Sequence, residues 1–231
     1  MTGMTIRAVQ FRSVLFLLGL SGISQLCGQY KDFRTWYEIE VNTGLKNGID
    51  LSAELEQRLQ DNSLRYDRTL LTLSADYRVN KYLDVGAGAR GLLTTDGEEN
   101  LQARYRLHGD ASGRYSLEAF DLSLRMRLQY GFDDLGNFTR VSDNSLVNRN
   151  RIRLRYRVFG TRVGTFVSVE SFHFASGRPA RRTYKARYSL GGSYTLTFRS
   201  EFGLRYILED EFNVPNPLQA HILVFSYSYN L

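Results

Sequence analysis

The sequence predicts an all-β fold, a transmembrane antiparallel up-and-down β-barrel of 10–12 strands, with twelve preferred, preceded by a cleaved signal peptide. Three observations predict this class: an export-type N-terminal segment, a stretch in which arginines alternate with apolar residues, and the recurrence of similar alternation along the chain. The composition agrees, because only 3 Pro among 231 residues, with 15 Tyr and 14 Phe, favours strands over disordered segments.

The first 28 residues have the pattern of a secretory signal peptide. Arg7 and Arg12 form a positive region, and residues 14–20 (VLFLLGL) form an apolar region that is followed by small and polar residues. The apolar run is far shorter than the roughly 20 residues that a spanning helix needs. We therefore expect cleavage near Gly28, with a signal peptide at 1–28 and a single outer-membrane β-barrel domain at 29–231.

The lone cysteine leaves a lipoprotein alternative open, in which Cys27 is lipidated after cleavage just before it. Leu26 is bulky where such sites carry a small residue, which favours cleavage after Gly28 instead. The mature chain then holds no cysteine and needs no disulfide.

Residues 150–158 (NRIRLRYRV) carry the strongest strand signal. Successive side chains of a strand point to opposite faces, so Arg151, Arg153, Arg155 and Arg157 share one face and the apolar residues share the other. A membrane barrel accommodates both, because its outer wall meets lipid and its lumen is polar. With the faces reversed, four arginines near the bilayer midplane would cost about 8 to 16 kcal/mol, which rivals the stability of a typical domain. The arginines are therefore predicted to face the lumen.

Similar alternation recurs in segments close to the 9 to 11 residues or so that a tilted membrane strand needs. The predicted strands are 36–41, 49–59, 69–79, 83–93, 101–115, 120–130, 150–158, 163–172, 184–194, 198–208 and 223–231. These segments number eleven, whereas bacterial single-chain barrels have even strand counts. Twelve strands are therefore preferred, on the expectation that a strand is missed or wrongly divided or that the first hairpin is reversed.

The predicted connections alternate between short and long, which assigns them to two rims. Short connections are expected at 44–48, 80–82, 116–118, 159–161 and 195–197, and longer ones at 61–65, 94–100, 133–148, 175–182 and 209–218. Bacterial barrels keep short turns on the periplasmic side and long loops outside the cell. The loops 133–148 and 209–218 are thus the expected partner-facing surfaces, with Phe138, Phe212 and Val214 as their apolar contact residues.

The inward charges separate into two predicted walls. An acidic wall on the first strands comprises Glu38, Glu40, Asp50, Glu54, Glu56 and Asp76. A basic wall on the fifth to seventh strands comprises Arg104, Arg106, Arg125, Arg127, Arg151, Arg153, Arg155 and Arg157. Two alternatives follow: in a narrow lumen the walls pair into a solid polar core, and in a wider one they set up a field across a pore that favours anions beside the arginines.

The net charge of +6 falls to +4 without Arg7 and Arg12, a mild excess. A basic chain can bind nucleic acid, but these arginines are spread over many strands and follow no recognised nucleic-acid-binding motif. With an export signal in front, the sequence argues against a nucleic-acid partner.

Catalysis and metal binding receive little support. His108 is expected to face inward near Ser112, but side chains two apart on one strand face stand about 6.5 to 7 Å apart, too far for a direct hydrogen bond. His173 and His221 are expected near a rim as structural residues. The acidic loop residues Glu98, Glu99, Glu209, Asp210 and Glu211 could collect surface calcium, but solvated loop charge is the simpler interpretation, and the histidines show no metal-ligand spacing.

Several stretches together resemble an uncharacterised outer-membrane barrel family of Bacteroidota, known as domain of unknown function 2490. They are the first strand with Trp36, YRVNKYLDVGAGAR at 77–90, RYRLHGDASGRYSLEAFDLSLRMRLQY at 104–130, and NRNRIRLRYRV at 148–158. The resemblance implies location and fold, and it supplies no activity or catalytic residues.

The function predicted from sequence is a non-catalytic, porin-like protein of the outer membrane of a Gram-negative bacterium. It is either a structural and interaction barrel or a small passive channel with an arginine-rich lumen wall, and the alternative is a lipid hydrolase using inward-facing His and Ser. The expected partners are outer-membrane lipid and the barrel insertion machinery, since the aromatic strand 223–231 (LVFSYSYNL) resembles its sorting signal. Small anionic solutes or a protein partner are further possibilities, and no cofactor or metal is expected.

Overall fold

The computed structural model describes residues 30–95, 101–132, 146–175 and 183–231, and these residues form eleven β-strands. The strands are β1 (Tyr30–Gly44), β2 (Ile49–Gln60), β3 (Arg65–Arg78), β4 (Leu83–Thr95), β5 (Leu101–Leu117), β6 (Phe120–Phe132), β7 (Leu146–Arg157), β8 (Val163–Phe174), β9 (Thr183–Thr197), β10 (Ser200–Glu211) and β11 (Leu218–Asn230). No helix in this described part of the chain is long and apolar enough to cross a membrane. The predicted signal peptide and Cys27 lie outside the described residues.

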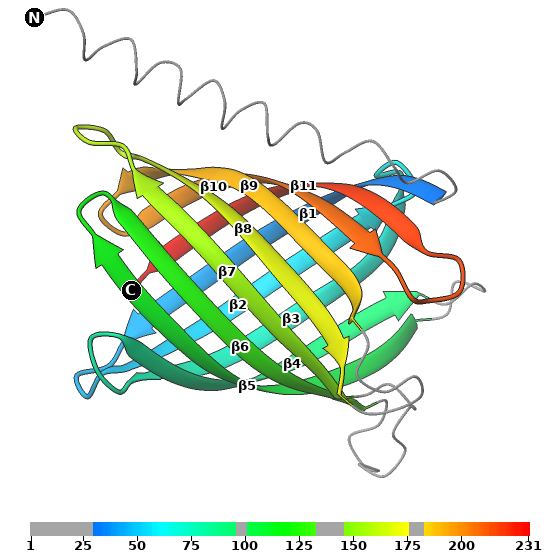
Figure 1. The fold of residues 1–231 in the computed structure, drawn as a ribbon, viewed down its shortest axis with the longest axis horizontal. Helices are drawn as coiled ribbons and strands as arrows, with labels where there is room; N and C mark the ends of the chain where they lie inside the picture. The colour runs from blue at the N-terminus through cyan, green and yellow to red at the C-terminus, as the bar shows by residue number, and fades with distance from the viewer. Residues whose placement is uncertain (1–29, 96–100, 133–145, 176–182) are drawn as a thin grey trace, which may run out of the picture. The chain divides into compact units, whose positions relative to one another are not determined.

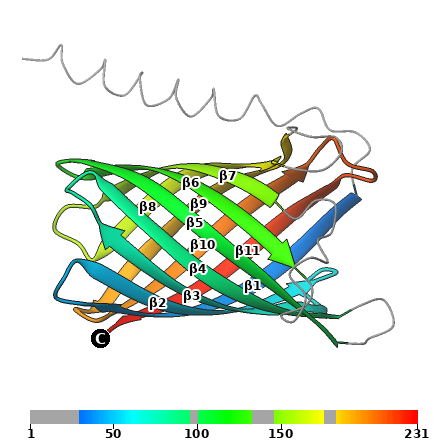
Figure 2. The same cartoon turned by 90° about the horizontal axis from the view of Figure 1, so that it is seen from below.

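The strands close into one barrel in which each strand pairs with its neighbours in sequence, and β1 meets β11 (Figures 1 and 2). The predicted all-β barrel is confirmed, and each of the eleven predicted segments lies largely within one of its strands. The preference for twelve strands is wrong, since the described barrel closes with eleven. Among the described residues, every strand corresponds to one predicted segment, so none is missed or wrongly divided.

The barrel closes at a parallel seam. Consecutive strands are antiparallel, for example β1 with β2 and β10 with β11. In a closed ring of eleven such strands, the first and last run in the same direction, as Figure 1 shows for β1 and β11. The Leu231 amide donates to the Asn42 carbonyl over 2.9 Å, and the rings of Tyr37 and Phe225 stack with centroids 5.7 Å apart. The prediction of a fully antiparallel barrel therefore fails at this pair of strands.

The connections lie at two rims, in the predicted alternation. One rim carries the short turns between β1 and β2, β3 and β4, β5 and β6, β7 and β8, and β9 and β10. The other rim, where β1 begins, carries the remaining connections, and residues 96–100, 133–145 and 176–182 of these lie outside the described residues, Phe138 included. We call these the turn rim and the loop rim. Gly48 and Gly160 have φ of 75° and 71° in two short turns, a conformation that glycine adopts without steric cost.

Two predicted loops are shorter in the structure. β7 begins at Leu146, before the predicted start at Asn150, because strand pairing with β6 extends to the Tyr130 and Leu146 register. β10 continues through Glu211, because Glu209, Asp210 and Glu211 all pair with β9, so these acids are not loop residues. Phe212 and Val214 remain in the connection, both half-buried.

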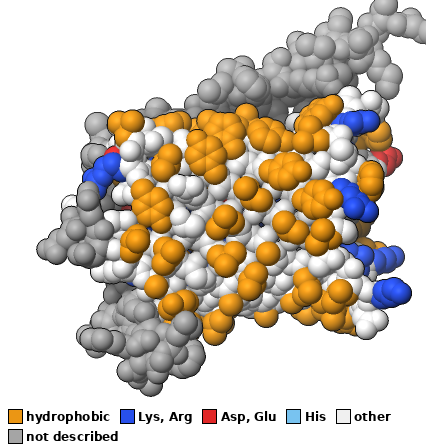
Figure 3. Space-filling model, turned by 180° about the vertical axis from the view of Figure 1, so that it is seen from behind, with side chains coloured by type: hydrophobic (Ala, Val, Ile, Leu, Met, Phe, Trp, Pro, Cys, Tyr) orange, Lys and Arg blue, Asp and Glu red, His pale blue; other side chains and the backbone are white. Residues whose placement is uncertain are grey.

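The outer face of the barrel is apolar. Leu71, Leu73, Ile152 and Leu154 have 51%, 55%, 56% and 41% of their surface exposed, and many other large apolar side chains are exposed in the same way. Figure 3 shows hydrophobic side chains spread over this wall, with Lys and Arg at its ends. Exposed apolar side chains of this extent mark an interaction surface, either for another protein or for a membrane.

A small apolar cluster fills the interior beside the seam. Trp36, Ile207, Ala220, Ile222 and Val224 are between 0% and 3% exposed and come from β1, β10 and β11. Two guanidinium groups lie near the Trp36 ring, that of Arg58 at 3.8 Å and that of Arg187 at 5.2 Å from its centroid. Such contacts are attractive because the ring face is electron-rich. On the inner side of the barrel, the seam between β1 and β11 is thus covered by packed apolar side chains.

The parallel seam predicts a specific disulfide. In a Cys27→Ser background, Tyr37→Cys combined with Phe225→Cys should cross-link on mild oxidation, because the two replaced rings are stacked across the seam. The matched pair Tyr37→Cys with Tyr229→Cys should stay reduced, since residue 229 lies four positions, or roughly 13 Å, further along β11. Peptide mass spectrometry distinguishes them, and the opposite result would contradict the parallel register.

Candidate functional site in the lumen

The barrel encloses a cavity of about 880 Å³. The structure places the whole predicted acidic wall on its lining, together with every member of the predicted basic wall except Arg157. Arg157 lies next to the turn between β7 and β8 and pairs with Asp121 over 3.4 Å. These residues reach one lumen because alternation along each strand turns them to the same side of the sheet.

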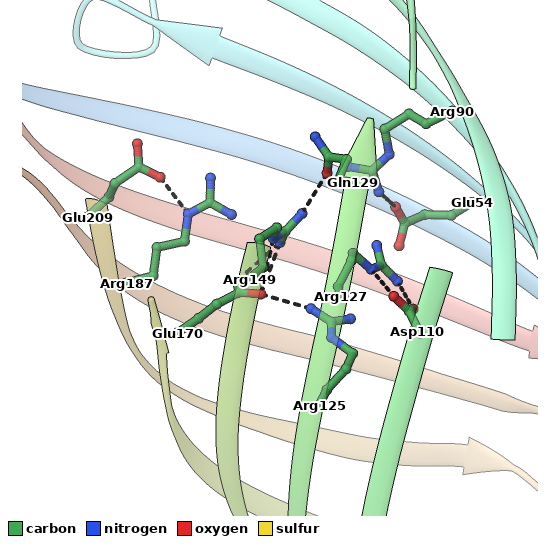
Figure 4. Close-up of polar contacts among 10 residues, drawn as sticks. All are labelled: Glu54, Arg90, Asp110, Arg125, Arg127, Gln129, Arg149, Glu170, Arg187 and Glu209. Atoms are coloured by element: carbon green, nitrogen blue, oxygen red, sulfur yellow. Dashed lines mark hydrogen bonds and ion pairs between the residues drawn. The ribbon is translucent and has the colours of Figure 1, made fainter. Parts of the chain in front are cut away.

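The centre of the lumen is organised around Glu170 of β8. Its carboxylate accepts from Arg125 at 2.8 Å and from Arg149 at 3.1 Å, and its side chain is 8% exposed (Figure 4). Arg149 also donates to Gln129 at 3.4 Å. Because a single carboxylate pairs with two arginines away from bulk water, this cluster carries an excess of positive charge.

Further buried pairs surround this cluster. Arg127 binds Asp110 with two hydrogen bonds, Arg187 and Lys185 share Glu209, Arg90 reaches Glu54, and Arg205 reaches Glu38. Figure 4 shows Arg127, Arg187 and Arg90 pointing with Arg149 into the same space from different strands. The lumen is therefore crossed by a network of fixed charges, and it is not an empty pore.

The pairing differs from the predicted contact between two opposite walls. Arg125 pairs with Glu170 and Arg155 with Glu201, so acids of β8 and β10 partner the basic wall. In the acidic wall, Glu56 pairs with Arg58 of its own strand, and Glu38 pairs with Arg205 of β10. Sequence reasoning missed Glu170, Glu201 and Glu209, although the inward parity of their strands could have identified them. It could not have assigned their partners, because several arginines on other strands compete for each acid.

Three arginines of the basic wall have no such partner. Arg106, Arg151 and Arg153 make no hydrogen bond or ion pair with any residue in the described ranges, although all three line the cavity. Arg153 stacks on Phe166 with its guanidinium carbon 3.7 Å from the ring centroid, and its Nε is buried without a hydrogen-bond partner there. These arginines present positive charge and free donors to the cavity.

Exposure to solvent increases toward the turn rim. The side chains of Arg78 and Asp50, which pair there over 3.7 Å, are 57% and 59% exposed. By contrast, the carboxylates of Glu56 and Glu209, nearer the loop rim, are only 4% exposed. The lumen is thus wet at the turn rim and closely packed beyond its middle.

His108 and Ser112, the inward-facing pair of the hydrolase alternative, are not bonded to each other among the described residues. His108 is 7% exposed and its Nε2 has no hydrogen-bond partner among the described residues, so Ser112 is not bound to it. Its ring occupies the space over Gly88, where a Cβ would lie 2.6 Å from the ring. Gly88 is therefore required for the close approach of β4 and this side chain. His173 and His221 are bound to neighbours outside the lumen, at Thr183 and Tyr206.

The described residues contain no group of three or more His, Cys, Asp or Glu side chains suited to hold a metal ion. Glu98 and Glu99 lie outside the described residues. Glu209 and Glu211 are paired with Lys185, and Asp210 accepts from the Gln219 amide at 2.7 Å. The prediction that this acidic triplet lies in a loop is wrong, since it belongs to β10.

The fold and lumen define a porin-like β-barrel. A solved structure of the NanC porin superposes with a TM-score of 0.54 at 14% sequence identity, covering 87% of this chain and 99% of that chain. At this identity the likeness concerns the fold alone. No curated protein matches the chain.

The chain belongs to the family described as protein of unknown function (DUF2490), whose pattern matches residues 33–216. The match confirms the family resemblance derived from the sequence. It extends from β1 to the connection before β11 and so covers nearly the whole barrel.

Neutralising Glu170 should destabilise the barrel. Glu170→Gln leaves Arg125 and Arg149 buried without a countercharge, and such a loss costs about 3 to 5 kcal/mol in unfolding free energy. Glu201→Gln is the matched control, because its pair with Arg155 is roughly one-third exposed and should contribute about 0 to 1 kcal/mol. Urea titration of both detergent-refolded variants measures the difference, and equal losses would show that the two sites are equally hydrated.

Proposed function

We propose that this protein is an outer-membrane β-barrel of a Gram-negative bacterium, exported by the signal peptide at 1–28, whose lumen binds and passes small anionic solutes. The observation that carries the solute proposal is the group of three cavity-lining arginines, Arg106, Arg151 and Arg153, that lack ion pairs in the described structure. The lumen itself is proposed to be non-catalytic, and the cleavage of 1–28 remains a prediction.

The two faces of the barrel support membrane insertion. The outer wall is apolar over its length while the inner wall is charged, the reverse of a soluble protein. All backbone groups of a closed barrel find partners within the sheet, which is what a spanning structure requires in lipid. The closed sheet and exposed apolar rows therefore suit a bilayer better than water.

The charge balance of the lumen supports an anionic solute. Burying a guanidinium without a carboxylate is costly, so a purely structural core would be expected to pair every arginine. Here acids partner some arginines, and Arg106, Arg151 and Arg153 are left with donors turned toward the cavity. A small anion entering from the wet turn rim could accept from Arg151 and Arg153, which lie nearer that rim than Arg106 does. Barrels of about eight strands are filled and those of sixteen hold open channels, so eleven strands fit a narrow, selective passage.

The insertion proposal is tested by two adjacent substitutions on β3. Leu73 is 55% exposed on the outer face, and Leu73→Arg should cost about 2 to 4 kcal/mol if that face meets lipid near the midplane. Ser74 lines the cavity on the acidic side, so Ser74→Arg should be tolerated. Folding yield into phospholipid vesicles measures both variants. Equal yields from vesicles would contradict a lipid-facing outer wall.

The passage proposal is tested by conductance of the refolded barrel in a planar bilayer. The wild type should conduct with anion preference, and Arg151→Glu with Arg153→Glu should shift the reversal potential toward cations, because the changed side chains line the cavity. Lys81→Glu with Arg162→Glu, two exposed turn residues, matches the change in net charge and should leave selectivity nearly unchanged. A tight seal from folded protein, or equal shifts in both double variants, would overturn this function.

A further inference from the structure

A chain of hydrogen bonds lies on the outer face of the barrel, near the loop rim. Ser171 Oγ is 3.0 Å from His173 Nε2, and His173 Nδ1 is 2.7 Å from Thr183 Oγ1. Glu170 and Phe172, which alternate with these residues on β8, line the lumen. The Ser171 and His173 side chains therefore point away from the lumen, toward the surface that we propose meets lipid.

The sequence argument against such a contact fails because it considers only the spacing of strand positions, which two side chains can bridge, as Asn150 and Asn148 also do at 2.6 Å. Side chains two apart on a regular strand stand about 6.5 to 7 Å apart. The pairing of β8 with β9 shifts between Phe172 and His173, so that His173 lies opposite Thr183 instead of Tyr184. The extra residue of this bulge is Tyr184 on β9, so the shift brings Thr183 opposite His173. The imidazole then spans Ser171 on its own strand and Thr183 on the next.

The two hydrogen bonds are compatible with the tautomer that a general base needs. A neutral imidazole has one N–H, and with Thr183 Oγ1 accepting from Nδ1–H, Nε2 is free to accept from the Ser171 hydroxyl. Thr183 is itself anchored, because Asn213 Nδ2 donates to its carbonyl over 2.9 Å. A nucleophile, a base and a third group that orients the base are the parts of a hydrolytic triad, whatever the fold.

A donor for a developing oxyanion lies on the neighbouring strand. Asn150 is the register partner of Ser171, and Asn148 is that of His173. The Asn150 amide donates one N–H to Asn148 Oδ1 at 2.6 Å, and an amide has two. Directly opposite side chains on adjacent strands are close enough to act on one bound group. The second N–H of Asn150 is thus well placed beside Ser171.

Apolar side chains border this polar group. Met126 and Leu128, the register partners of Asn150 and Asn148 on β6, are 60% and 50% exposed, and Val169 on β8 is 48% exposed. Polar side chains are costly on a lipid-facing wall and usually serve a function there. The position at the border between the apolar wall and the loop rim matches the depth at which lipid ester groups lie in a bilayer.

We propose that Ser171, His173 and Thr183 form an esterase site that cleaves a carboxylic ester of a membrane lipid. Ser171 Oγ attacks the ester carbonyl carbon while His173 Nε2 takes the hydroxyl proton. The C–O bond to the lipid alcohol then breaks, and His173 returns the proton to the leaving oxygen. Water attacks the resulting acyl-serine with His173 again as base, which releases the fatty acid and restores Ser171. Thr183 is the positioning residue.

The choice of a lipid ester rests on the proposed membrane location. A soluble ester inside the lumen cannot reach these side chains, because the sheet separates the two faces. Acyl chains alongside Met126, Leu128 and Val169 would bring an ester carbonyl to Ser171.

The test uses the folded full barrel in mixed micelles with a diacyl phospholipid, and fatty acid release is measured. Wild-type protein should release fatty acid and be labelled by a fluorophosphonate at Ser171. Ser171→Ala and His173→Ala should each lower release by at least about a hundredfold, as expected for loss of a nucleophile or a general base. A diether phospholipid, which has no carbonyl ester, should release nothing.

The controls separate catalysis from folding. His221→Ala removes another outer-face histidine, bound to Tyr206 at 2.6 Å, and should keep full activity. Thr183→Val should lower activity and shift its pH profile, whereas Thr183→Ser should restore both, since only the hydroxyl is needed. Absence of release and labelling in folded wild-type protein, or unchanged release by Ser171→Ala, would overturn the proposal. Conductance plays no part in this assay, so a sealed lumen would overturn the passage alone.

Discussion

The two-residue period of side chains along a strand is the constraint on which this structure depends. Each strand presents one row to the lumen and one to the outside, so Arg153 and Leu154 enter opposite environments although they are adjacent. Closure of the sheet removes every free edge and makes the separation complete. The charged interior and the apolar exterior are consequences of one periodicity, and neither could be changed without moving the other.

This periodicity explains why the sequence predicts the strands well and the closure poorly. The eleven alternating segments correspond to the observed strands because a tilted strand is specified locally. The direction in which β1 meets β11 is set by contacts such as those of Tyr37 with Phe225 and of Leu231 with Asn42, which are almost two hundred residues apart in sequence. Without these contacts, the prediction relied on the even strand numbers of bacterial barrels, and it therefore preferred twelve strands. The apolar cluster around Trp36 was also hidden, since its members are scattered over three strands.

The lumen shows the same division between local and long-range information. Alternation places Arg125 and Arg151 on the inner face, but it does not distinguish an arginine that shares Glu170 from one that lacks a partner. Pairing depends on how β7 and β8 are staggered around the barrel, which the strand pattern does not reveal. The resulting arrangement combines ion pairs that hold the strands together with unpaired cations that attract anions. Stability and the proposed selectivity would thus arise from the same residue type in one wall.

The outer face carries the hydrogen-bonded side chains of Ser171, His173 and Thr183. His173 reaches Ser171 two positions away on its own strand, and a shift in pairing with β9 places Thr183 opposite it. Because the lumen and the outer wall are separated by the sheet, chemistry at Ser171 would neither need nor disturb the charge network around Glu170. One barrel could therefore support solute passage inside and ester cleavage outside as independent functions, each governed by its own side of the strands.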